Sequence, residues 1–476
     1  MALHKAQYRF RRFDNCYLLS SDIGAWVFLS TDEFDDFVKQ PVDALSDDLV
    51  ERLRTRGIVV DTNNLEREVE LSHRKYAPYF DGPVLFIIGV TGACNLGCEY
   101  CHADAQIRSP NQDRFSQGTI SRLVDFILDA AGDRATVEFQ GGEPLLAFDS
   151  IRRIIEEFKT RLEFEPGQIR FTLSSNLTTL NNEKIRYLTN NLVQIVASID
   201  GPPDIHDEQR PYASGKGSYR TTSRAFDRAK DAGAKMGIIA VATRHSQGNA
   251  EAIVDEVIDR SVQDVCINMP EQSGRALEKE QWKKIGLSPE QCFELWRDAV
   301  EYIATQQKSD QAPINEKFLQ LILYKLFMPE SPNFTDWRSP CGATIGQISF
   351  DHEGNIYPCD EARGDKNLLL GNVNEDSYAD VIRNELTQEI IGSSLLENGI
   401  CDACVYKPFC GVCPVLRYKA GGDFQSFRGF RERCRMFTAM FDYVFDKLLD
   451  GDHTVFQIPQ PRMIENESAT HPGAGR

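Results

Sequence analysis

The stretch VTGACNLGCEYC, residues 90–101, carries the strongest chemical signal in this chain. It places Cys94, Cys98 and Cys101 directly after the apolar run at residues 84–90. Three thiolates can hold three irons of a 4Fe–4S cluster, which leaves the fourth iron open to a reactant. A structural zinc site needs a fourth ligand, and the adjacent His102 is poorly placed to turn back onto the same metal. The spacing therefore indicates an iron–sulfur cluster with one open iron.

Length and composition limit what the rest of the chain can be. At 476 residues it should fold as two or three domains. Its net charge of −18 argues against a general nucleic-acid or anionic-membrane surface. Residues 1–15 lack the apolar core of a secretory signal, and no stretch approaches the roughly 20 apolar residues of a membrane span. We expect a cytoplasmic protein whose 13 cysteines mostly bind metal, with a disordered tail at residues 465–476.

The first sixty residues carry the signals of a small separate domain. Apolar and aromatic runs predict three strands, then a helix capped by Thr31, a second helix and a short last strand. This order resembles the small winged-helix peptide-recognition domain of many peptide-modifying enzymes, in which a leader peptide adds a strand to the sheet edge. A structural cap on the next domain is the alternative. The predicted elements span residues 8–13, 16–20, 25–29, 31–38, 47–56 and 57–61.

From about residue 84 to 270 the chain alternates between strand and helix patterns. Six such steps predict a parallel sheet with helices on its outside. The active site of such a sheet lies at the carboxyl ends of its strands, where the cysteine triad follows the first strand. The predicted strands are 84–90, 136–140, 169–174, 194–199, 236–242 and 265–269, and the helices are 117–131, 150–162, 182–190, 218–232 and 250–260.

A second motif, Gln140-Gly-Gly-Glu-Pro144, follows the second predicted strand. Two glycines allow the backbone to approach a ligand closely. With the triad, this segment resembles the GGEP motif of radical S-adenosylmethionine (SAM) enzymes. The resemblance implies an α/β fold with a partial (β/α)6 TIM-like barrel. It also implies that SAM binds the open iron and is cleaved to a 5′-deoxyadenosyl radical, which abstracts a hydrogen atom. Gly141, Gly142, Glu143 and Pro144 would then contact the SAM amino group.

Polar residues at the ends of later strands complete the expected SAM pocket. By the resemblance, Ser198 and Asp200 bind the ribose hydroxyls with Asn176 nearby, and Tyr100 lies near the adenine. Arg210 ends the segment His-Asp-Glu-Gln-Arg, which resembles the family's HDxxR motif, and would form a bidentate pair with the SAM carboxylate. Ordinary strand-end turns and a solvated surface arginine are the alternatives.

A cysteine-rich region at residues 341–434 resembles the SPASM domain, which carries two auxiliary iron–sulfur clusters. Its pattern begins Cys341-x12-Gly354-x4-Cys359. It departs from the family in having two residues between Cys410 and Cys413 instead of the usual three. The inner cluster would have three thiolates, so its fourth iron is open or bound by another residue or by substrate. Zinc knuckles are the alternative. Family topology assigns Cys401, Cys404, Cys410 and Cys434 to an outer cluster and Cys341, Cys359 and Cys413 to the inner one.

Asp360 directly follows Cys359 in a Tyr-Pro-Cys-Asp segment. In anaerobic sulfatase-maturating enzymes, a similar segment places an aspartate as the candidate general base. The resemblance therefore implies that Asp360 takes a proton as the substrate radical loses an electron. Burial beside an anionic cluster should raise the pKa of this carboxyl and suit it to that role. A turn cap or an ion pair with Arg363 is the alternative.

The resemblance covers nearly the whole chain and implies its division. Residues 1–75 would form the winged-helix-like recognition or capping domain and residues 80–275 the radical SAM barrel. Residues 276–335 would form a helical bridge, residues 336–450 the auxiliary-cluster domain and residues 451–476 a tail. Segments 8–13, 139–146, 360–363 and 370–373 resemble the His-Xaa-Ser system radical SAM maturase.

We expect an enzyme that modifies a ribosomally made peptide or protein by cross-linking or oxidation. The implied cofactors are SAM, one SAM-binding 4Fe–4S cluster and two auxiliary clusters. The implied partners are a precursor peptide or protein, a flavodoxin- or ferredoxin-type electron donor and a second radical SAM protein. Conversion of Cys or Ser to formylglycine in a sulfatase is the enzymatic alternative. A non-catalytic iron–sulfur electron carrier is the alternative of another class.

Overall fold

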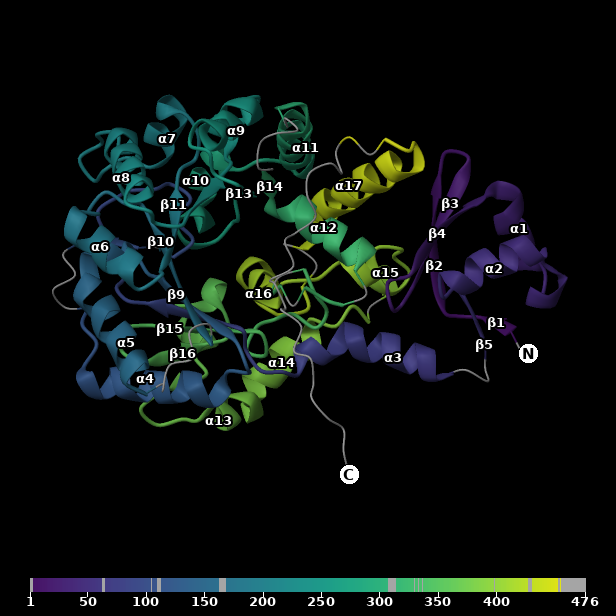
Figure 1. Ribbon diagram of the computed structural model, residues 1–476, viewed down its shortest axis with the longest axis horizontal. Coiled ribbons are helices and arrows are strands. Elements are labelled where there is room, and N and C mark those ends of the chain that lie inside the picture. The colour runs from purple at the N-terminus through teal and green to yellow at the C-terminus, as the bar shows by residue number, and fades with distance from the viewer. Residues whose placement is uncertain are drawn as a thin grey trace.

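The computed structural model describes most of the chain but not the tail predicted at residues 465–476. Its described elements form an N-terminal domain, a large sheet flanked by helices and a C-terminal region of short elements around one long helix (Figure 1). The described residues are 3–61, 65–103, 105–108, 113–161, 168–306, 314–328, 330–332, 334–335, 337–397, 399–426, 430–452 and 454.

The large sheet has ten strands in the described residues, in the order β14-β13-β12-β11-β10-β9-β6-β15-β16-β17. From β14 to β15 neighbouring strands run parallel, and β16 and β17 are antiparallel. All six predicted strands are present with ends within one residue of the prediction, so the predicted α/β fold is confirmed. The strands are β6 (Leu85–Gly89), β9 (Ala135–Gln140), β10 (Ile169–Ser175), β11 (Gln194–Ser198), β12 (Met236–Val241), β13 (Asp264–Asn268), β14 (Asn315–Glu316), β15 (Gln347–Phe350), β16 (Asn355–Tyr357) and β17 (Gly371–Asn372).

The prediction missed the strands that widen this sheet at both ends. β14 is only two residues long, too short for a periodic pattern. β15 lies far along the chain yet pairs with the first barrel strand, Gln347 opposite Leu85 and Phe350 opposite Ile88. Such pairing depends on tertiary contacts, so no local signal announces it. As a result the cysteine-rich region joins the sheet directly beside β6.

Helices cover one face of the sheet, and the other face carries both polar and apolar side chains. Val137, Phe139 and Ile195 point toward the helices and are fully buried, which stabilises the fold by roughly 1.5–3 kcal/mol for each such side chain. Their neighbours alternate to the opposite face because the side-chain period of a strand is two. The helices are α4 (Gln117–Ala130), α5 (Phe148–Arg161), α6 (Asn182–Asn190), α7 (Pro203–Gln209), α8 (Tyr219–Asp231), α9 (Ala250–Asp259), α10 (Lys279–Ile285), α11 (Pro289–Gln306) and α12 (Lys317–Phe327).

The N-terminal domain has its own small core. Strands β2, β3 and β4 form an antiparallel sheet, and β1 pairs with β5. The helix predicted to be capped by Thr31 is instead capped by Ser30, whose hydroxyl accepts from the backbone N–H of Glu33 in a reciprocal capping box. Thr31 is the first helical residue. The elements are β1 (Leu3–Lys5), β2 (Tyr8–Phe13), β3 (Cys16–Ser21), β4 (Trp26–Ser30), α1 (Thr31–Lys39), η1 (Val42–Ala44), α2 (Asp47–Thr55) and β5 (Val59–Asp61).

This domain docks on the C-terminal region through the long helix α17 (Phe430–Leu449), which lies beside it in Figure 1. The Trp26 ring lies 5.3 Å from that of Phe445, and its Nε1 donates to the Leu326 carbonyl at 3.0 Å. Ser20 donates to the Val405 carbonyl at 2.6 Å. The N-terminal domain is thus held by both apolar and polar contacts.

Among the described residues, none of the helices combines the length and the apolar character of a membrane span.

Short elements make up the rest of the described chain. The remaining elements are α3 (Leu65–Tyr76), η2 (Ala77–Tyr79), β7 (Ala93–Cys94), β8 (Gln106–Ile107), η4 (Pro144–Ala147), η5 (Arg244–Ser246), η6 (Gly274–Leu277), η7 (Asp360–Ala362), η8 (Lys366–Leu368), α13 (Tyr378–Arg383), α14 (Glu385–Ser393), α15 (Gly399–Asp402), η9 (Lys407–Phe409) and α16 (Pro414–Gly421).

Candidate active site

The cysteine triad lies in a loop at the carboxyl end of β6. Cys94 and Cys98 are buried, Cys101 is half-buried, and all three pack in one small apolar cluster with Tyr100 and Tyr212. Desolvation raises the pKa of the Cys94 thiol to about 11 and that of Cys98 to about 12. Buried thiols of this kind keep their protons unless a metal replaces them. The triad is therefore a set of soft donors grouped for one metal centre.

The two glycines of the second motif pack against the cysteine loop itself. Gly142 and Glu143 donate from their backbone N–H groups to the carbonyls of Thr91 at 2.7 Å and Ala93 at 2.8 Å. A Cβ at Gly141 would lie 2.3 Å from the Thr91 oxygen, and one at Gly142 would lie 2.2 Å from the Ala93 oxygen. The two glycines thus let the protein's own backbone come close, as was predicted for a ligand. Their contacts hold the triad loop against the end of β9.

Glu143 is a buried carboxylate that binds groups of its own chain. It accepts hydrogen bonds from the backbone N–H groups of Leu145 at 2.9 Å and Asn176 at 2.8 Å, and from the Ser175 hydroxyl at 2.7 Å. Burial nevertheless raises its pKa. Three of its roughly four acceptor positions are therefore occupied. Glu143 ties the turn that begins at Pro144 to the end of β10, and its contact with the SAM amino group stays a prediction.

Tyr100 and Arg210, two of the predicted SAM-pocket residues, both contact the buried carboxylate of a third, Asp200. The fully buried Asp200 accepts from the Tyr100 hydroxyl and from Arg210 Nε, the latter at 2.8 Å. Its other oxygen accepts from the Val241 N–H at 3.0 Å. The Arg210 guanidinium also stacks 5.1 Å from the centre of the Tyr100 ring. Asp200 therefore orients both an aromatic ring beside the triad and a cation.

His206 holds this arrangement in place, a role that the sequence analysis did not assign to it. Its Nδ1 accepts from the Asp200 N–H at 3.4 Å, and its Nε2 lies 3.1 Å from the Ser218 hydroxyl. Ser218 donates its only proton to the Arg210 carbonyl, so Nε2 must carry the imidazole proton. Burial lowers the pKa of His206 to about 4. The first residue of the HDxxR segment was the available signal, because it lies on α7 between Asp200 and Arg210.

Asn176 and Ser198 occupy neighbouring strand ends. The Asn176 amide donates to Asn95 in the triad loop at 3.1 Å, and its oxygen accepts from Thr178. Ser198 is half-buried at the end of β11. Asn176 therefore links β10 to the triad loop, while their predicted contacts with SAM stay predictions.

A polar network lines the face of the sheet that the helices do not cover. Glu138 accepts from the Gln140 amide at 2.8 Å and from the Ser174 hydroxyl at 2.7 Å. All three side chains are half-buried and point to this inner face. Arg363 reaches it from the cysteine-rich region, donating to Gln140 at 3.3 Å. The network joins two domains at the strand ends where chemistry is expected.

Asp360 belongs to the same network. Its Oδ1 accepts from Arg363 Nη2 at 2.6 Å, and its Oδ2 lies 3.0 Å from His102 Nε2. Desolvation alone would raise the pKa of Asp360, but Arg363 and His102 outweigh it and hold that pKa well below its usual range. The expected rise in pKa is therefore wrong. The ion pair with Arg363 is present, and Asp360 bridges the triad loop and the inner face.

The auxiliary cysteines fall into two groups in space. Cys341, Cys359 and Cys413 lie in one apolar cluster. Cys401, Cys410 and Cys434 lie in another, and burial and the nearby Cys404 thiol raise the pKa of Cys410 to about 12. These are the memberships that family topology assigns to the inner and outer clusters. Of the other cysteines, Cys292 is buried and Cys16 half-buried, and the Cys266 thiol donates to Asn268 at 3.3 Å.

The donor sets suit iron–sulfur clusters. Thiolates are the usual ligands of such clusters, and ten of the thirteen cysteines form the three groups. In the described residues no group of three or more His, Cys, Asp or Glu converges closely enough to hold a single metal ion. A tetrahedral zinc site would need such a group, whereas ligands of a four-iron cluster bind different irons and stand further apart.

Comparison with known proteins agrees with this geometry. The model of the radical SAM superfamily matches residues 88–257, and that of the SPASM iron–sulfur cluster-binding domain matches residues 341–405. This chain is a radical SAM enzyme with a SPASM domain. Its cofactors are 4Fe–4S clusters and SAM, which these two domains bind.

Curated relatives of this radical SAM/SPASM enzyme include sulfatase-maturating enzymes. The cysteine-type anaerobic enzyme of Clostridium perfringens is 22% identical over 384 residues, which cover 77% of this chain and 97% of the relative. The serine-type enzyme of Bacteroides thetaiotaomicron is 24% identical over 398 residues, 78% of this chain and 91% of the relative.

Solved structures share the fold. The enzyme anSMEcpe with bound AdoMet superposes with a TM-score of 0.68 at 19% identity, over 79% of this chain and all of that one. Streptococcus suis SuiB bound to its precursor peptide SuiA gives a TM-score of 0.55 at 16% identity, over 90% of this chain and 99% of that one.

Proposed function

We propose that this radical SAM enzyme modifies a ribosomally made peptide or protein. The polar network at the strand ends is the observation that carries the proposal. It places Glu138, Gln140 and Asp360 around one side of the sheet, next to the triad loop and in reach of the cysteine-rich region. Such a surface suits a polar, backbone-rich substrate held between two cluster-binding regions.

When bound to the triad, the cluster and SAM supply a 5′-deoxyadenosyl radical that abstracts a hydrogen atom. The residues of this chain hold the reactants for that chemistry. Asp200 keeps the Arg210 guanidinium and the Tyr100 ring beside the triad, where Arg210 offers its remaining N–H donors to the SAM carboxylate. Gly141, Gly142, Glu143, Pro144, Asn176 and Ser198 complete the proposed pocket.

Asp360 is the proposed acceptor of the substrate proton. Its carboxylate is ionised, because Arg363 and His102 stabilise the charge, and an ionised carboxylate can accept a proton at Oδ2. His102 lies at hydrogen-bond distance from that atom and is partly exposed to solvent. The Asp360 carboxylate outweighs desolvation and raises the pKa of His102 to about 9, so His102 donates to Oδ2 as an imidazolium and orients the proposed acceptor. The ten grouped cysteines are the proposed cluster ligands.

The N-terminal domain is the proposed peptide-recognition element. Its sheet has free edges at β2 and β4 among the described strands, and a peptide can add a strand to such an edge. SuiB, which was solved with a precursor peptide, matches 90% of this chain. We propose the same class of substrate here, and resemblance to the His-Xaa-Ser system maturases narrows it to a repeat-bearing peptide.

Sulfatase maturation is the second candidate, because the similar curated proteins carry that activity in their names. The match to anSMEcpe leaves about a fifth of this chain uncovered, which favours peptide maturation. The proposed partners also include a flavodoxin- or ferredoxin-type electron donor and a second radical SAM protein. The cytoplasmic location stays a prediction.

The test is an anaerobic reaction of the purified enzyme with SAM, a reductant and synthetic peptides. 5′-Deoxyadenosine and a peptide with two residues joined, located by tandem mass spectrometry, would support peptide cross-linking. A product that reacts with a hydroxylamine probe carries an aldehyde and would support formylglycine formation. If no peptide or SAM concentration yields 5′-deoxyadenosine, the proposal fails.

A further inference from the structure

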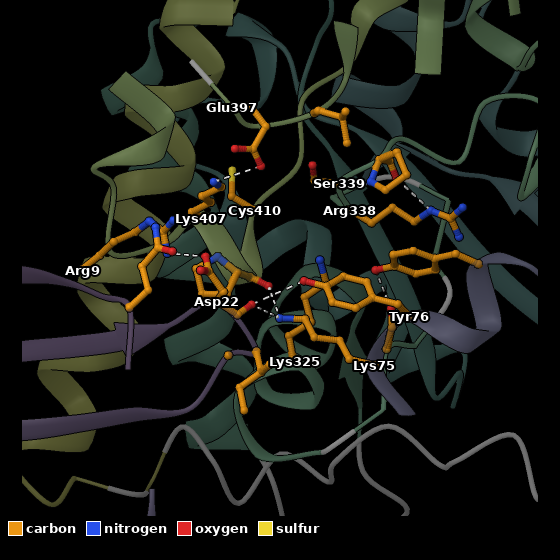
Figure 2. Close-up of a pocket in the computed structure, with 18 of the residues that line it drawn as sticks. Arg9, Asp22, Lys75, Tyr76, Lys325, Arg338, Ser339, Glu397, Lys407 and Cys410 are labelled. Carbon is orange, nitrogen blue, oxygen red and sulfur yellow. Dashed lines mark hydrogen bonds and ion pairs between the residues drawn. The ribbon is translucent and has the colours of Figure 1, made fainter. Parts of the chain in front are cut away.

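A cavity of about 430 Å³ lies where the N-terminal domain meets α3, α12 and the cysteine-rich region (Figure 2). Its volume is within the range of small-molecule sites, roughly 300–1,000 Å³. None of the proposed SAM contacts lines it, but Cys410 does. The cavity is therefore a second site, separate from the strand ends and next to the outer cysteine group.

Basic side chains lie deep in this cavity, and acidic side chains lie nearer to solvent. Five cationic and four acidic side chains line it. The cations lie inside, with Arg9 only 4% and Arg338 only 2% exposed. The acids lie toward solvent, since the side chains of Asp402 and Glu397 are 50% and 70% exposed. An anion that enters would therefore gain most at the bottom of the cavity, away from the exposed carboxylates of Asp402 and Glu397.

Two of the cations are neutralised by acids at the rim. Arg9 Nη1 donates to Asp22 at 2.6 Å, and its Nη2 donates to Asp402 at 3.2 Å. Lys407 donates to Asp402 at 2.8 Å and to Glu397 at 3.2 Å. These side chains form one continuous chain of ion pairs at the entrance of the cavity.

Lys75 and Lys325 are different, because their ammonium groups donate hydrogen bonds to backbone carbonyls, and that of Lys75 also lies 5.6 Å from the centre of the Tyr76 ring. Lys75 Nζ donates to the carbonyls of Asp22 at 3.1 Å and Pro408 at 3.4 Å. Lys325 Nζ donates to those of Trp337 and Phe409, the latter at 2.9 Å. No carboxylate of the described residues forms an ion pair with either group.

Each of these ammonium groups can donate one further hydrogen bond to an anion. Each has three donors, and the hydrogen bonds above use two of them. A buried charge that its neighbours compensate only in part is costly, and desolvation outweighs the attraction of Asp22 and lowers the pKa of Lys75 to about 8. A bound anion would restore the balance of charge at both lysines.

We propose that this cavity binds an oxyanion, a carboxylate or phosphate group, held by the ammonium groups of Lys75 and Lys325. The proposal does not depend on the reaction proposed above. The anionic group belongs either to a free small molecule or to an acidic residue of a peptide at the domain junction, and both share one chemistry.

The test measures binding of sodium malonate and inorganic phosphate to the anaerobic, cluster-loaded, full-length protein by calorimetry. Sodium chloride at equal ionic strength is the reference. Lys75→Met and Lys325→Met keep the aliphatic stem and remove the charge, and Lys39→Met on the exposed face of α1 is the matched control. Loss of one charged donor should raise Kd about tenfold or more, while the control should bind as the wild type.

Iron content and circular dichroism of each variant show whether it is folded, and Lys75→Arg keeps the charge if Lys75→Met does not fold. A peptide containing one Asp, compared with its Asn counterpart, identifies the source. Displacement of the Asp peptide by malonate assigns the anion to a peptide, and binding of the small probes alone assigns it to a free molecule. If the wild type binds no probe saturably beyond chloride, or both folded lysine variants bind as tightly as the wild type, the proposal is wrong.

Discussion

Replacement of Asp200 by Asn should destabilise the barrel strongly. Asp200 is fully buried, Arg210 is 8% exposed, and the two form an ion pair of 2.8 Å. The substitution leaves the guanidinium buried without its counterion, a change that costs about 3–5 kcal/mol. The new amide oxygen can still accept a hydrogen bond from the Val241 N–H. The lost stability therefore comes mainly from the ion pair between Asp200 and Arg210. For a unit of barrel size, roughly 2–4 °C per kcal/mol converts this to a fall in Tm of about 6–20 °C.

The assay is thermal unfolding of the anaerobic protein, followed by circular dichroism. Asp35→Asn is the control, because Asp35 and Lys39 form an exposed pair, and it should change stability by about 0.5 kcal/mol or less. The double variant Asp200→Asn/Arg210→Met removes both charges, so its Tm should lie above that expected from adding the single effects. SAM affinity, measured by equilibrium dialysis, should fall in Asp200→Asn. A Tm within about 2 °C of the wild type, or additive single effects, would refute the reasoning.

Three further predictions follow from the site. Replacing Cys94, Cys98 and Cys101 together by Ala should lower the iron content from about twelve to about eight per chain; a fall to zero, with zinc present, would contradict the auxiliary clusters. Gly142→Ala should lower Tm and the iron content together, because its Cβ would lie 2.2 Å from the Ala93 oxygen; a normal Tm would show that the loop can shift. His206, whose pKa is about 4 when folded and about 6.5 when unfolded, contributes stability that is lost as pH falls below about 6.5, because the unfolded chain then binds more protons. At pH 5 the loss should be about 2 kcal/mol relative to pH 7, and His206→Asn should show a flatter dependence of Tm on pH; an unchanged slope would count against the buried neutral imidazole.

Much of the fold was readable because its signals are local. Strands such as β9 and β11 end within a residue of their predicted limits, since apolar runs bounded by turn residues need no distant partner to be recognised. The pairing of β15 with β6 was not readable, because it depends on two segments about 260 residues apart. The two-residue β14 was missed because a pair of residues has no period.

For the site, local spacing named the residues but not what each one touches. The sequence assigned Glu143 to a ligand, whereas the structure shows its carboxylate bonded to Leu145, Ser175 and Asn176. The expected rise in the pKa of Asp360 failed because Arg363 and His102 lie against it. His102 comes from a loop more than 250 residues away, so that contact is set by folding alone.

The sequence by itself determined the chemistry of this protein: which thiols are present, at what spacing, and that a GGEP turn follows the next strand. Those features are local, since ligand type and turn geometry depend on neighbouring residues. Only the tertiary structure decided how the cysteines group, that Asp200 joins Tyr100 to Arg210, and that Lys75 and Lys325 face one cavity. Those are distances between segments remote in the chain, and packing of the whole core sets them.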